Sequence, residues 1–489
     1  MKKLYPRVES GGGGDIRLFN TLSRRKETFV PLRRGQVSMY HCGPTVYDFA
    51  HIGNLRAYVF ADILRRVFEY AGFAVKQVIN ITDVGHLTND ADEGEDKIEE
   101  SAKRQGKSAK EITRFFTEAF HNDLFRINVN TKGTIFPKAT EHIGEQIALA
   151  KTLEEKGYAY KTSDGIYFDT SRFERYGELG GINLQGLKEG ARIALNSRKK
   201  NPADFALWKL SEESGKRQQE WESPWGMGFP GWHLECSAMA MKYLGKTFDI
   251  HTGGVDHIAI HHQNEIAQSE CATGRPFVRY WLHSEHLRIE GRKISKSLGN
   301  TIFLKNLAGR GIRPLDYRYW LLTSHYRTPV NFTWEALQAA KNSLFRLQRL
   351  FIEELGGKDG GIAAGYAARF RNSLFDDLNT PEALAVLWQM VKDKSVKPDD
   401  KRFTLLNFDK VLGLKLGQLD GELKETVRKP MALDDLPPEI RLLTGERQKA
   451  RAEGRWQDAD ALREKIAAAG FDIIDTPLGQ RIYQRSGKK

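Results

Sequence analysis

Short apolar runs and helically spaced apolar residues alternate over the first part of the chain. Residues 37–40 form an apolar run, the glycine and proline within residues 42–45 interrupt it, and residues 55–70 carry apolar side chains at helical spacing. A further strand is predicted over residues 75–81. This order is typical of a parallel sheet with crossover helices, whose ligands bind beyond the carboxyl ends of the strands. We therefore predict an α/β fold with its chemistry in the turns after the strands.

The pattern changes between about residues 131 and 224. A helix is predicted near residues 141–156, followed by short strand-like segments such as residues 166–169 in a charged stretch that contains several glycines. Alternation of strand and helix then resumes at residues 231–244, 247–250 and 261–272, and it ends in a basic loop at residues 292–300. The sheet domain is thus predicted to be split by an insertion.

The chain becomes helical after about residue 334. Thr380 is predicted to be a helix N-cap because Pro381 follows it, and proline is favoured at the first helical position. Residues 441–489 include 11 basic and 7 acidic residues, and a helix is predicted over residues 458–468. We expect a helix bundle and then a small terminal module, whose positive charge fits RNA binding and ordinary solvated surface equally well.

Length and composition are those of a globular protein with several domains. The 489 residues equal about three typical domains, and 40% hydrophobic and 28% charged content is ordinary. No run of about 20 apolar residues could span a bilayer, and residues 1–14 lack the apolar stretch of a secretion signal. We expect a cytoplasmic protein with no membrane partner.

The charge balance and the cysteines narrow the chemistry. Lysine and arginine outnumber the acids by 75 to 63, and a net charge of +12 favours a phosphate-rich partner such as RNA. The three cysteines, Cys42, Cys236 and Cys271, are odd in number and widely spaced, so they do not form a disulfide framework. We expect a reducing compartment and treat metal ligation as a hypothesis.

Two short motifs could bind a nucleotide. His51, Ile52, Gly53 and Asn54 open a predicted helix, where free amide donors favour phosphate and a glycine permits close approach. Far along the chain, residues 293–297 read Lys-Ile-Ser-Lys-Ser, and two lysines three apart could meet the oxygens of a triphosphate. Taken singly, the first motif could be a polar helix start and the second a basic surface loop.

Cysteine, histidine and carboxylate side chains form a possible metal site. Cys42 and Cys236 lie in separate segments, and His261 and Glu265 are four residues apart on one face of a predicted helix. Two thiolates, one imidazole and one carboxylate make a reasonable zinc set. Ligands from three segments are not a compact finger motif, however, and buried cysteines usually just pack.

Together the two nucleotide motifs resemble, in the same order, the signatures His-Ile-Gly-His and Lys-Met-Ser-Lys-Ser of the class I aminoacyl-tRNA synthetases. The segments around Cys42 and Cys236 resemble the cysteinyl-tRNA synthetase family, and this resemblance covers nearly the whole chain, through residues 375–381. It implies four zinc ligands, which fall on Cys42, Cys236, His261 and Glu265. Helical geometry prefers His261 to its neighbour His262, which is three residues from Glu265 and rotated by about 100° from His261.

The resemblance also assigns roles to other residues and to partners. It implies that catalysis depends on His51, Lys293 and Lys296, that ATP is bound by His51, Asn54, Asp256, Lys293, Ser295 and Lys296, and that the amino acid is bound by Gly43, Thr45, Thr82 and Trp232. The partners would be L-cysteine, ATP with Mg²⁺, and tRNA(Cys), for a chain that we expect to be a monomer. Two departures are Asn54, where the signature has histidine, and residues 83–86, where some relatives carry Asp-Ile-Asp-Asp.

The implied fold is a Rossmann-like parallel-sheet catalytic domain split by an insertion, then an α-helical bundle and a small C-terminal domain. The expected divisions are an N-terminal segment (1–36), the two halves of the catalytic domain (37–130 and 226–305), the connective insertion (131–225), a stem-contact region (306–345), the bundle (346–440) and the terminal domain (441–489).

The implied reaction is the ligation of cysteine to tRNA through cysteinyl-adenylate, with one zinc ion per chain that selects the thiol. A soft thiolate binds zinc better than a hydroxyl does, whereas an apolar pocket separates near-isosteres by only about 100-fold. Two alternatives stay open: a related ligase that joins cysteine to an amino sugar, and a non-catalytic RNA-binding relative. Neither explains both the nucleotide motifs and a basic module after the bundle.

Overall fold

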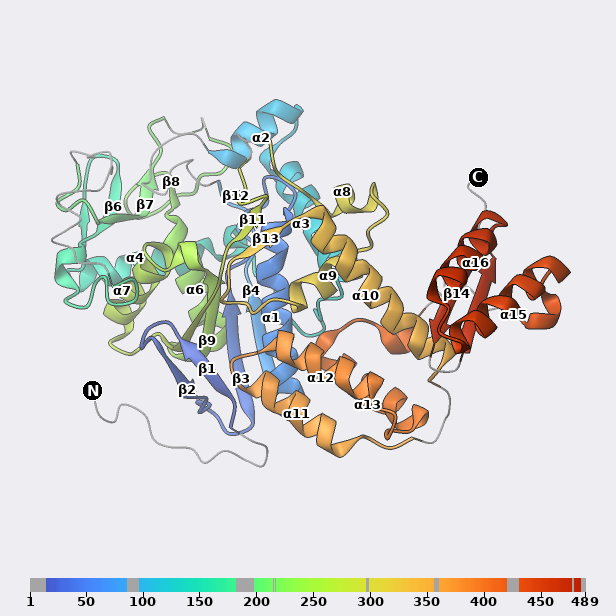
Figure 1. Ribbon diagram of the computed structural model, residues 1–489. Coiled ribbons are helices and arrows are strands. Elements are labelled where there is room, and N and C mark those ends of the chain that lie inside the picture. The colour runs from blue at the N-terminus through green and yellow to red at the C-terminus, as the bar shows by residue number, and fades with distance from the viewer. Residues whose placement is uncertain are drawn as a thin grey trace. The chain divides into compact units, whose positions relative to one another are not determined.

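A parallel sheet forms the centre of the molecule, as the sequence predicts. The computed structural model describes residues 15–85, 96–181, 198–213, 215, 217–295, 299–355, 360–419, 431–476 and 479–484. The sheet has four strands in the order β10-β9-β3-β4, all parallel (Figure 1). Their bounds are β3 (Gln36–His41), β4 (Ala74–Ile79), β9 (Phe248–Gly254) and β10 (Val278–Ser284). Beyond β4, isolated parallel bridges join Val78 to Ile135 and Ile81 to Lys138.

Crossover helices cover this sheet on both sides. Helix α1 (Ile52–Tyr70) connects β3 to β4, and α7 (His261–Thr273) connects β9 to β10. The two crossovers run in opposite directions along the sheet, so right-handed connections place α1 and α7 on opposite faces. Helix α6 (Trp232–Leu244) packs on α7 and on β3 and β4. Its Met239 shares a buried apolar cluster with Tyr40 of β3 and Phe248 of β9, so α6 is anchored on the central strands.

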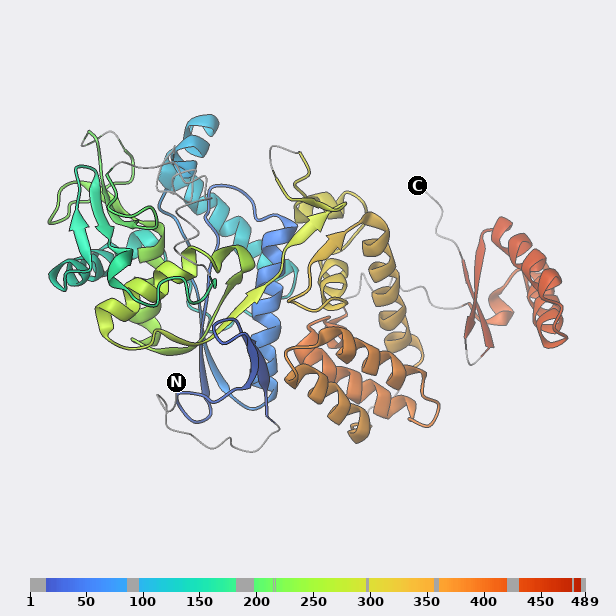
Figure 2. The same ribbon diagram turned by 60° about the vertical axis from the view of Figure 1, so that its left-hand side comes forward.

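The insertion between β4 and α6 is confirmed as a distinct layer. It contains an antiparallel four-stranded sheet in the order β5-β6-β7-β8, which packs on α4 and α6 (Figures 1 and 2). The strands are β5 (Ala159–Lys161), β6 (Gly165–Phe168), β7 (Phe205–Leu210) and β8 (Gly228–Pro230). The helices before and within it are α2 (Lys97–Gln105), α3 (Ala109–Arg126), η1 (Ala139–His142), α4 (Ile143–Glu155) and η2 (Thr170–Arg172).

A small sheet of the order β12-β11-β13 follows the central sheet and carries the basic loop. Strand β11 (Leu287–Ile289) pairs antiparallel with β12 (Arg292–Lys293) and parallel with β13 (Val330–Phe332). Helices α8 (Leu304–Ala308) and α9 (Pro314–Leu322) lie between β12 and β13 in sequence, and a hairpin of β1 (Arg17–Asn20) and β2 (Arg25–Thr28) precedes β3.

Helices dominate the chain after β13. The bundle consists of α11 (Ala364–Phe375), α12 (Thr380–Lys392) and α13 (Pro398–Leu412), and α13 packs against α1 (Figures 1 and 2). The predicted N-cap at Thr380 is wrong. Asn379 caps α12, because its Oδ1 accepts a hydrogen bond from the backbone N–H of Glu382 at 3.2 Å, and Thr380 is already helical.

The chain separates into two compact units. Residues 1–344 and 360–414 form the first, and residues 345–359 and 415–489 form the second, so the division falls within α10 (Trp334–Glu353) and after α13. The second unit holds η4 (Leu416–Gln418), η5 (Leu433–Asp435), α15 (Pro438–Ala452), α16 (Trp456–Ala468), β14 (Phe471–Thr476) and β15 (Gly479–Gln484). The boundary expected at 440/441 lies inside α15.

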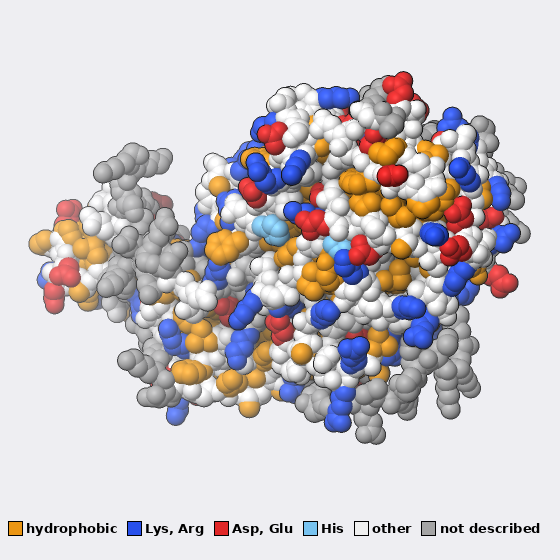
Figure 3. All heavy atoms as spheres, turned by 180° about the vertical axis from the view of Figure 1, so that it is seen from behind, with side chains coloured by type: hydrophobic (Ala, Val, Ile, Leu, Met, Phe, Trp, Pro, Cys, Tyr) orange, Lys and Arg blue, Asp and Glu red, His pale blue; other side chains and the backbone are white. Residues whose placement is uncertain are grey.

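The surface and the helices carry two further observations. Within the described ranges, every helix is too short or too polar to cross a membrane. On the face shown in Figure 3, Lys and Arg side chains are interspersed with Asp and Glu.

Candidate active site

The predicted phosphate-binding motif stands at the first turn of α1. His51 is the N-cap, and its Nδ1 accepts from the N–H of Asn54 at 3.1 Å while Asn54 Oδ1 accepts from the N–H of His51 at 3.2 Å. This reciprocal pair is a capping box. A Cβ on Gly53 would lie 2.8 Å from Cδ1 of Ile294, so the glycine lets the basic loop approach the helix start. Asn54 thus has a structural function where the class signature has histidine.

The basic loop is tied to itself and to α1. Asn300 accepts from the N–H of Ser295 at 2.9 Å and donates to the carbonyl of Lys293 at 3.0 Å. The N–H of Ile52 donates to the carbonyl of Ile302 at 2.9 Å. Lys293 is exposed at the end of β12, and Lys296 lies outside the described residues. The two nucleotide motifs, more than 200 residues apart in sequence, are therefore neighbours.

One pocket of about 500 Å³ brings most of the predicted site residues together, and its size is ordinary for a ligand site. It is lined, among others, by Cys42, Gly43, Thr45, His51, Asn54, Thr82, Trp232, Cys236, Asp256, His261 and Lys293. Of the other predicted residues, Glu265 is fully buried behind this lining, and Ser295 is not part of it. Three of the possible metal ligands thus line the same pocket as residues of both nucleotide motifs.

The turns after the strands position these side chains. Gly43 comes just after β3 and lies against the residue that follows β4. A Cβ on Gly43 would come within 1.4 Å of the carbonyl oxygen of Asn80. The Asn80 side chain accepts from the N–H of Gly43 at 2.8 Å and donates to Oγ1 of Thr82 at 3.0 Å. Trp232 stacks on the ring of His261, with 4.1 Å between centroids. Thr82 and Trp232 are thereby fixed beside the possible metal ligands.

Cys42, Cys236 and His261 converge, although they come from the turn after β3, from α6 and from α7. One ligand atom from each lies within 4.8 Å of the other two. Oε1 of Glu265 lies 3.6 Å from Nε2 of His261. Nε2 of His261 and Oε1 of Glu265 are buried without a hydrogen bond to any described residue, and the second carboxylate oxygen of Glu265 faces His251. Buried polar atoms are nearly always satisfied, so these atoms fit ligands of a metal ion.

The two thiols differ in acidity. Burial raises the pKa of Cys42, but hydrogen bonding from Cys236 and the charge of His262 outweigh it and hold that pKa well below the ordinary value. The hydrogen bond to Cys42, together with burial, raises the pKa of Cys236 well above it. The Cys236 thiol thus donates to the sulfur of Cys42, and a cation in place of that proton would stabilise both thiolates.

Further histidines surround the same point: His262, which helical geometry disfavours, and His251 and His257, which the sequence motifs do not predict. His262 Nε2 lies 3.2 Å from Cys42 Sγ, and His251 Nε2 lies 2.9 Å from Oε2 of Glu265. Two overlapping groups of possible metal ligands contain these histidines: Cys42 with His257 and His262, and His251 with His262 and Glu265. His262 therefore reaches the cluster, although helical geometry favours His261. A signal was available: four of the chain's 13 histidines, His251, His257, His261 and His262, fall within 12 residues.

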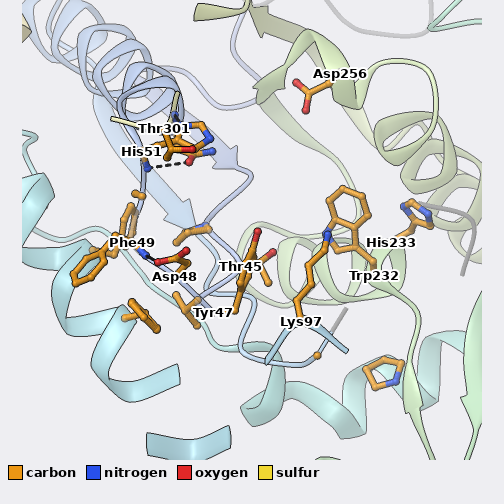
Figure 4. Close-up of a pocket in the computed structure, with 18 of the residues that line it drawn as sticks. Thr45, Tyr47, Asp48, Phe49, His51, Lys97, Trp232, His233, Asp256 and Thr301 are labelled. Carbon is orange, nitrogen blue, oxygen red and sulfur yellow. Dashed lines mark hydrogen bonds between the residues drawn. The ribbon is translucent and has the colours of Figure 1, made fainter. Parts of the chain in front are cut away.

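A second pocket of about 380 Å³ shares several lining residues with the first, among them Thr45, His51 and Trp232. In Figure 4, His51 and Phe49 line one side of it and Trp232 and His233 the other. Phe49 and Phe303 are half-buried, with 6.0 Å between ring centroids, and Nζ of Lys305 lies 4.6 Å from the Phe49 ring. Lys97 and Lys209 add cationic side chains. Aromatic rings and cations in one groove suit single-stranded nucleic acid.

The chain matches three protein-family descriptions in consecutive segments. Residues 28–342 match the class I (C) tRNA synthetase catalytic domain, and residues 369–416 match the DALR domain. Residues 433–485 match the cysteinyl-tRNA ligase anticodon binding domain. The third match coincides with most of the second compact unit.

Curated relatives are similar over almost their whole length. The chain is 52% identical to cysteine–tRNA ligase 1 of Burkholderia lata, over 96% of this chain and 97% of the relative. It is 43% identical to the cysteine–tRNA ligase of Treponema denticola, over 96% of this chain and 99% of the relative.

A solved structure confirms the fold. The methionyl-tRNA synthetase of Mycobacterium tuberculosis in complex with methionyl-adenylate superposes with a TM-score of 0.53 at 14% identity, over 83% of this chain and 95% of that one. At this identity the likeness concerns the fold alone.

Proposed function

The chain belongs to the cysteine–tRNA ligase family of class I aminoacyl-tRNA synthetases, and from this premise we propose how its own residues carry out the ligation. One observation carries the assignment: the paired thiols of Cys42 and Cys236 line the same pocket as His51 and Lys293. A thiol-selecting group and two triphosphate-binding motifs in one cavity suit the activation of cysteine by ATP.

We assign Zn²⁺ to Cys42, Cys236, His261 and Glu265. The choice of these four among the neighbouring histidines rests on the family resemblance, on the convergence of the first three, and on the unsatisfied atoms of His261 and Glu265. When bound, zinc would supply a soft Lewis acid that accepts the substrate thiolate and disfavours the hydroxyl of serine. Trp232 and Thr82 would shape the rest of the amino-acid pocket.

In the activation step, the carboxylate of cysteine attacks the α-phosphate of ATP in line. A carboxyl oxygen to phosphorus bond forms, the bond from the α-phosphate to pyrophosphate breaks, and cysteinyl-adenylate results. His51 at the helix start, Lys293 and Lys296 stabilise the charge on the phosphates, Asn54 and Ser295 help to bind them, and Mg²⁺ accompanies ATP. Asp256 would accept from the ribose hydroxyls. Positioning and electrostatics suffice, with no covalent enzyme intermediate.

In the transfer step, the terminal ribose hydroxyl of tRNA attacks the carbonyl carbon of the adenylate, and AMP leaves. The pocket between Phe49 and Trp232 gives the single-stranded 3′ end a path to that carbonyl. We assign RNA binding also to the bundle, to the stem-contact region 306–345 and to the second compact unit. The reaction would take place in the cytoplasm.

The reaction is tested by incubating the purified chain with ATP, labelled cysteine and bulk tRNA, with an amino-sugar acceptor in a parallel tube. The expected result is acid-precipitable label on tRNA and none on the sugar. Label on the sugar alone would favour the sugar-ligase alternative, and no cysteine-dependent exchange of pyrophosphate into ATP would favour the non-catalytic one.

Removing residues 416–489, which make up most of the second compact unit, is expected to separate activation from transfer. A chain that ends at Lys415 keeps the pocket and the bundle, so cysteine-dependent exchange should continue. Its KM for tRNA should rise about tenfold or more because a linked contact is lost, and the salt dependence of KM should become flatter. Continued exchange is the folding control. An unchanged KM and salt dependence would show that the second unit does not bind RNA.

A further inference from the structure

Arg56 is a buried arginine in the first turns of α1, two residues after Asn54. Its side chain is buried, and the residue is 5% exposed. The guanidinium donates to five backbone carbonyls: those of Glu285 at 2.7 Å, His286 at 2.8 Å, His325 at 3.3 Å, Tyr326 at 3.2 Å and Thr328 at 2.6 Å. Burial lowers the pKa of Arg56 to about 10, so it remains cationic at neutral pH.

The five carbonyls belong to two segments that support the basic loop. Residues 285–286 join β10 to β11, and residues 325–328 lead into β13. These segments also bond to each other, since the N–H of Glu285 donates to the carbonyl of Tyr326 and the N–H of Val330 to that of His286. Strand β11 then pairs with β12, which ends at Lys293. Arg56 therefore holds the base of the hairpin that presents the lysine.

The other end of the basic loop returns to the same helix. The N–H of Ile52 donates to the carbonyl of Ile302 at 2.9 Å, and His51 forms an antiparallel bridge with Phe303. The described flanks of the loop are thus fixed to α1 at both ends, through backbone contacts of residues 51–52 on one side and through Arg56 on the other.

The segment 325–328 is also anchored from its far side. The Tyr326 hydroxyl donates to Oδ1 of Asp377 at 2.7 Å, and Nε of Arg327 donates to Oδ2 at 2.8 Å. Asp377 is 1% exposed and has a φ of +64°, in the loop between α11 and α12. This second anchor limits how far the segment could shift to meet a shorter side chain at position 56.

We propose that Arg56 is a positioning residue that sets the separation of the two nucleotide motifs, His51 to Asn54 and the loop of Lys293, and thereby the binding of ATP in the activation step. The inference rests on the proposed function, which assigns both motifs to ATP. Five carbonyls in two segments suit the planar set of N–H donors of arginine, whereas lysine offers three donors from one nitrogen. A displacement of about 1 Å at a reacting group can slow a reaction about 100-fold.

The chain offers a matched control on the same helix. Arg65 is 6% exposed, and its guanidinium also donates to backbone carbonyls, those of Asn130 at 3.0 Å and Lys132 at 2.7 Å. These two carbonyls lie in the connection that follows α3, and its side-chain partners are Glu69, Gln77 and Thr134, so all of its partners lie away from the basic loop. Arg56→Lys and Arg65→Lys thus remove similar buried hydrogen bonds from α1, but only the first touches the link between the motifs.

The experiment measures cysteine-dependent ATP–pyrophosphate exchange, zinc content and thermal unfolding of the full-length chain and both variants. We expect Arg56→Lys to raise KM for ATP or lower kcat by about tenfold or more, with KM for cysteine and zinc content unchanged. Arg65→Lys should lower the unfolding temperature similarly and leave the constants for ATP unchanged. If Arg56→Lys does not fold, Tyr326→Phe loosens the same segment and should raise KM for ATP in the same direction.

Equal effects of the two lysine variants on the constants for ATP would overturn the proposal, as would an equal rise of both KM values for Arg56→Lys. If Arg56→Lys does not fold, unchanged kinetic constants for ATP in Tyr326→Phe would overturn the proposal. Absence of exchange by the unmodified chain, or full exchange by Lys293→Ala, would instead contradict the proposed function. The two failures are thereby distinguishable.

Discussion

Replacing Cys236 by serine is expected to remove zinc from the protein and cysteine activation with it. Cys236 is 1% exposed and donates a hydrogen bond to Cys42, so the substitution leaves a poor, hard ligand in a buried position. Mutation of residues that only support the metal ligands already lowers metal affinity by about 10–100-fold, so loss of a ligand itself should lower it further. The zinc content measured by elemental analysis and the rate of cysteine-dependent exchange should fall together, because the thiol of the substrate cysteine would lose its binding partner.

Cys271 provides the matched control for this prediction. It lies in α7 at 8% exposure, within an apolar cluster with Leu234 and Ala267, and burial raises its pKa to about 12. Cys271→Ser should keep one zinc ion per chain and nearly full exchange activity. Retention of zinc and of cysteine affinity by Cys236→Ser would show that the ligand set is wrong and would direct attention to His257 and His262.

The parallel sheet could be predicted because its local signals agree with one another. An apolar run, a Gly-Pro turn and helical periodicity follow in order from β3 to β4, and each is readable within a few residues. The prediction of the N-cap of α12 was wrong because its local signals did not single out one residue. Asn379 and Thr380 are adjacent and both are good caps, so propensity could not choose between them. The choice follows from the preceding residues Asp377 and Leu378, which have positive φ.

The metal cluster was predictable only in part. Spacing places His261 and Glu265 on one helical face, and the resemblance adds Cys42 and Cys236. His251 and His283 reach the cluster because β9 pairs with β10, and His262 bonds to His283 at 2.7 Å. Such contacts depend on which strands are neighbours, and local periodicity carries no information on that.

The contacts of Arg56 could not be predicted from the sequence at all. All five of its acceptors are backbone carbonyls, which every residue possesses, and they lie more than 220 residues away in sequence. No residue type at positions 285–286 or 325–328 could have signalled the interaction. Only the fold shows that one guanidinium connects the two nucleotide motifs.

Lys293→Ala is expected to lower the rate of cysteine-dependent exchange by about 100-fold or more, the usual effect of losing one preorganised contact to developing charge. Lys293 lines the pocket with His51, and its backbone is held by Asn300, so the loop should keep its course without the side chain. Zinc content should be unchanged, since Lys293 is not among the four residues proposed to bind zinc. The sequence predicts an effect of the same size for Lys296→Ala.

The neighbouring residue separates the loss of a phosphate contact from the loss of general positive charge. Arg292 is exposed in the same short strand but does not line the pocket. Arg292→Ala removes the same charge from the same strand, and its exchange rate should stay close to that of the unmodified chain. Pre-steady-state measurement of adenylate formation would assign the effect of Lys293→Ala to the chemical step. If both variants lose activity equally, the loop attracts ATP by charge alone; if Lys293→Ala exchanges at the full rate, the triphosphate binds elsewhere, and the pocket beside Phe49 becomes the next place to search.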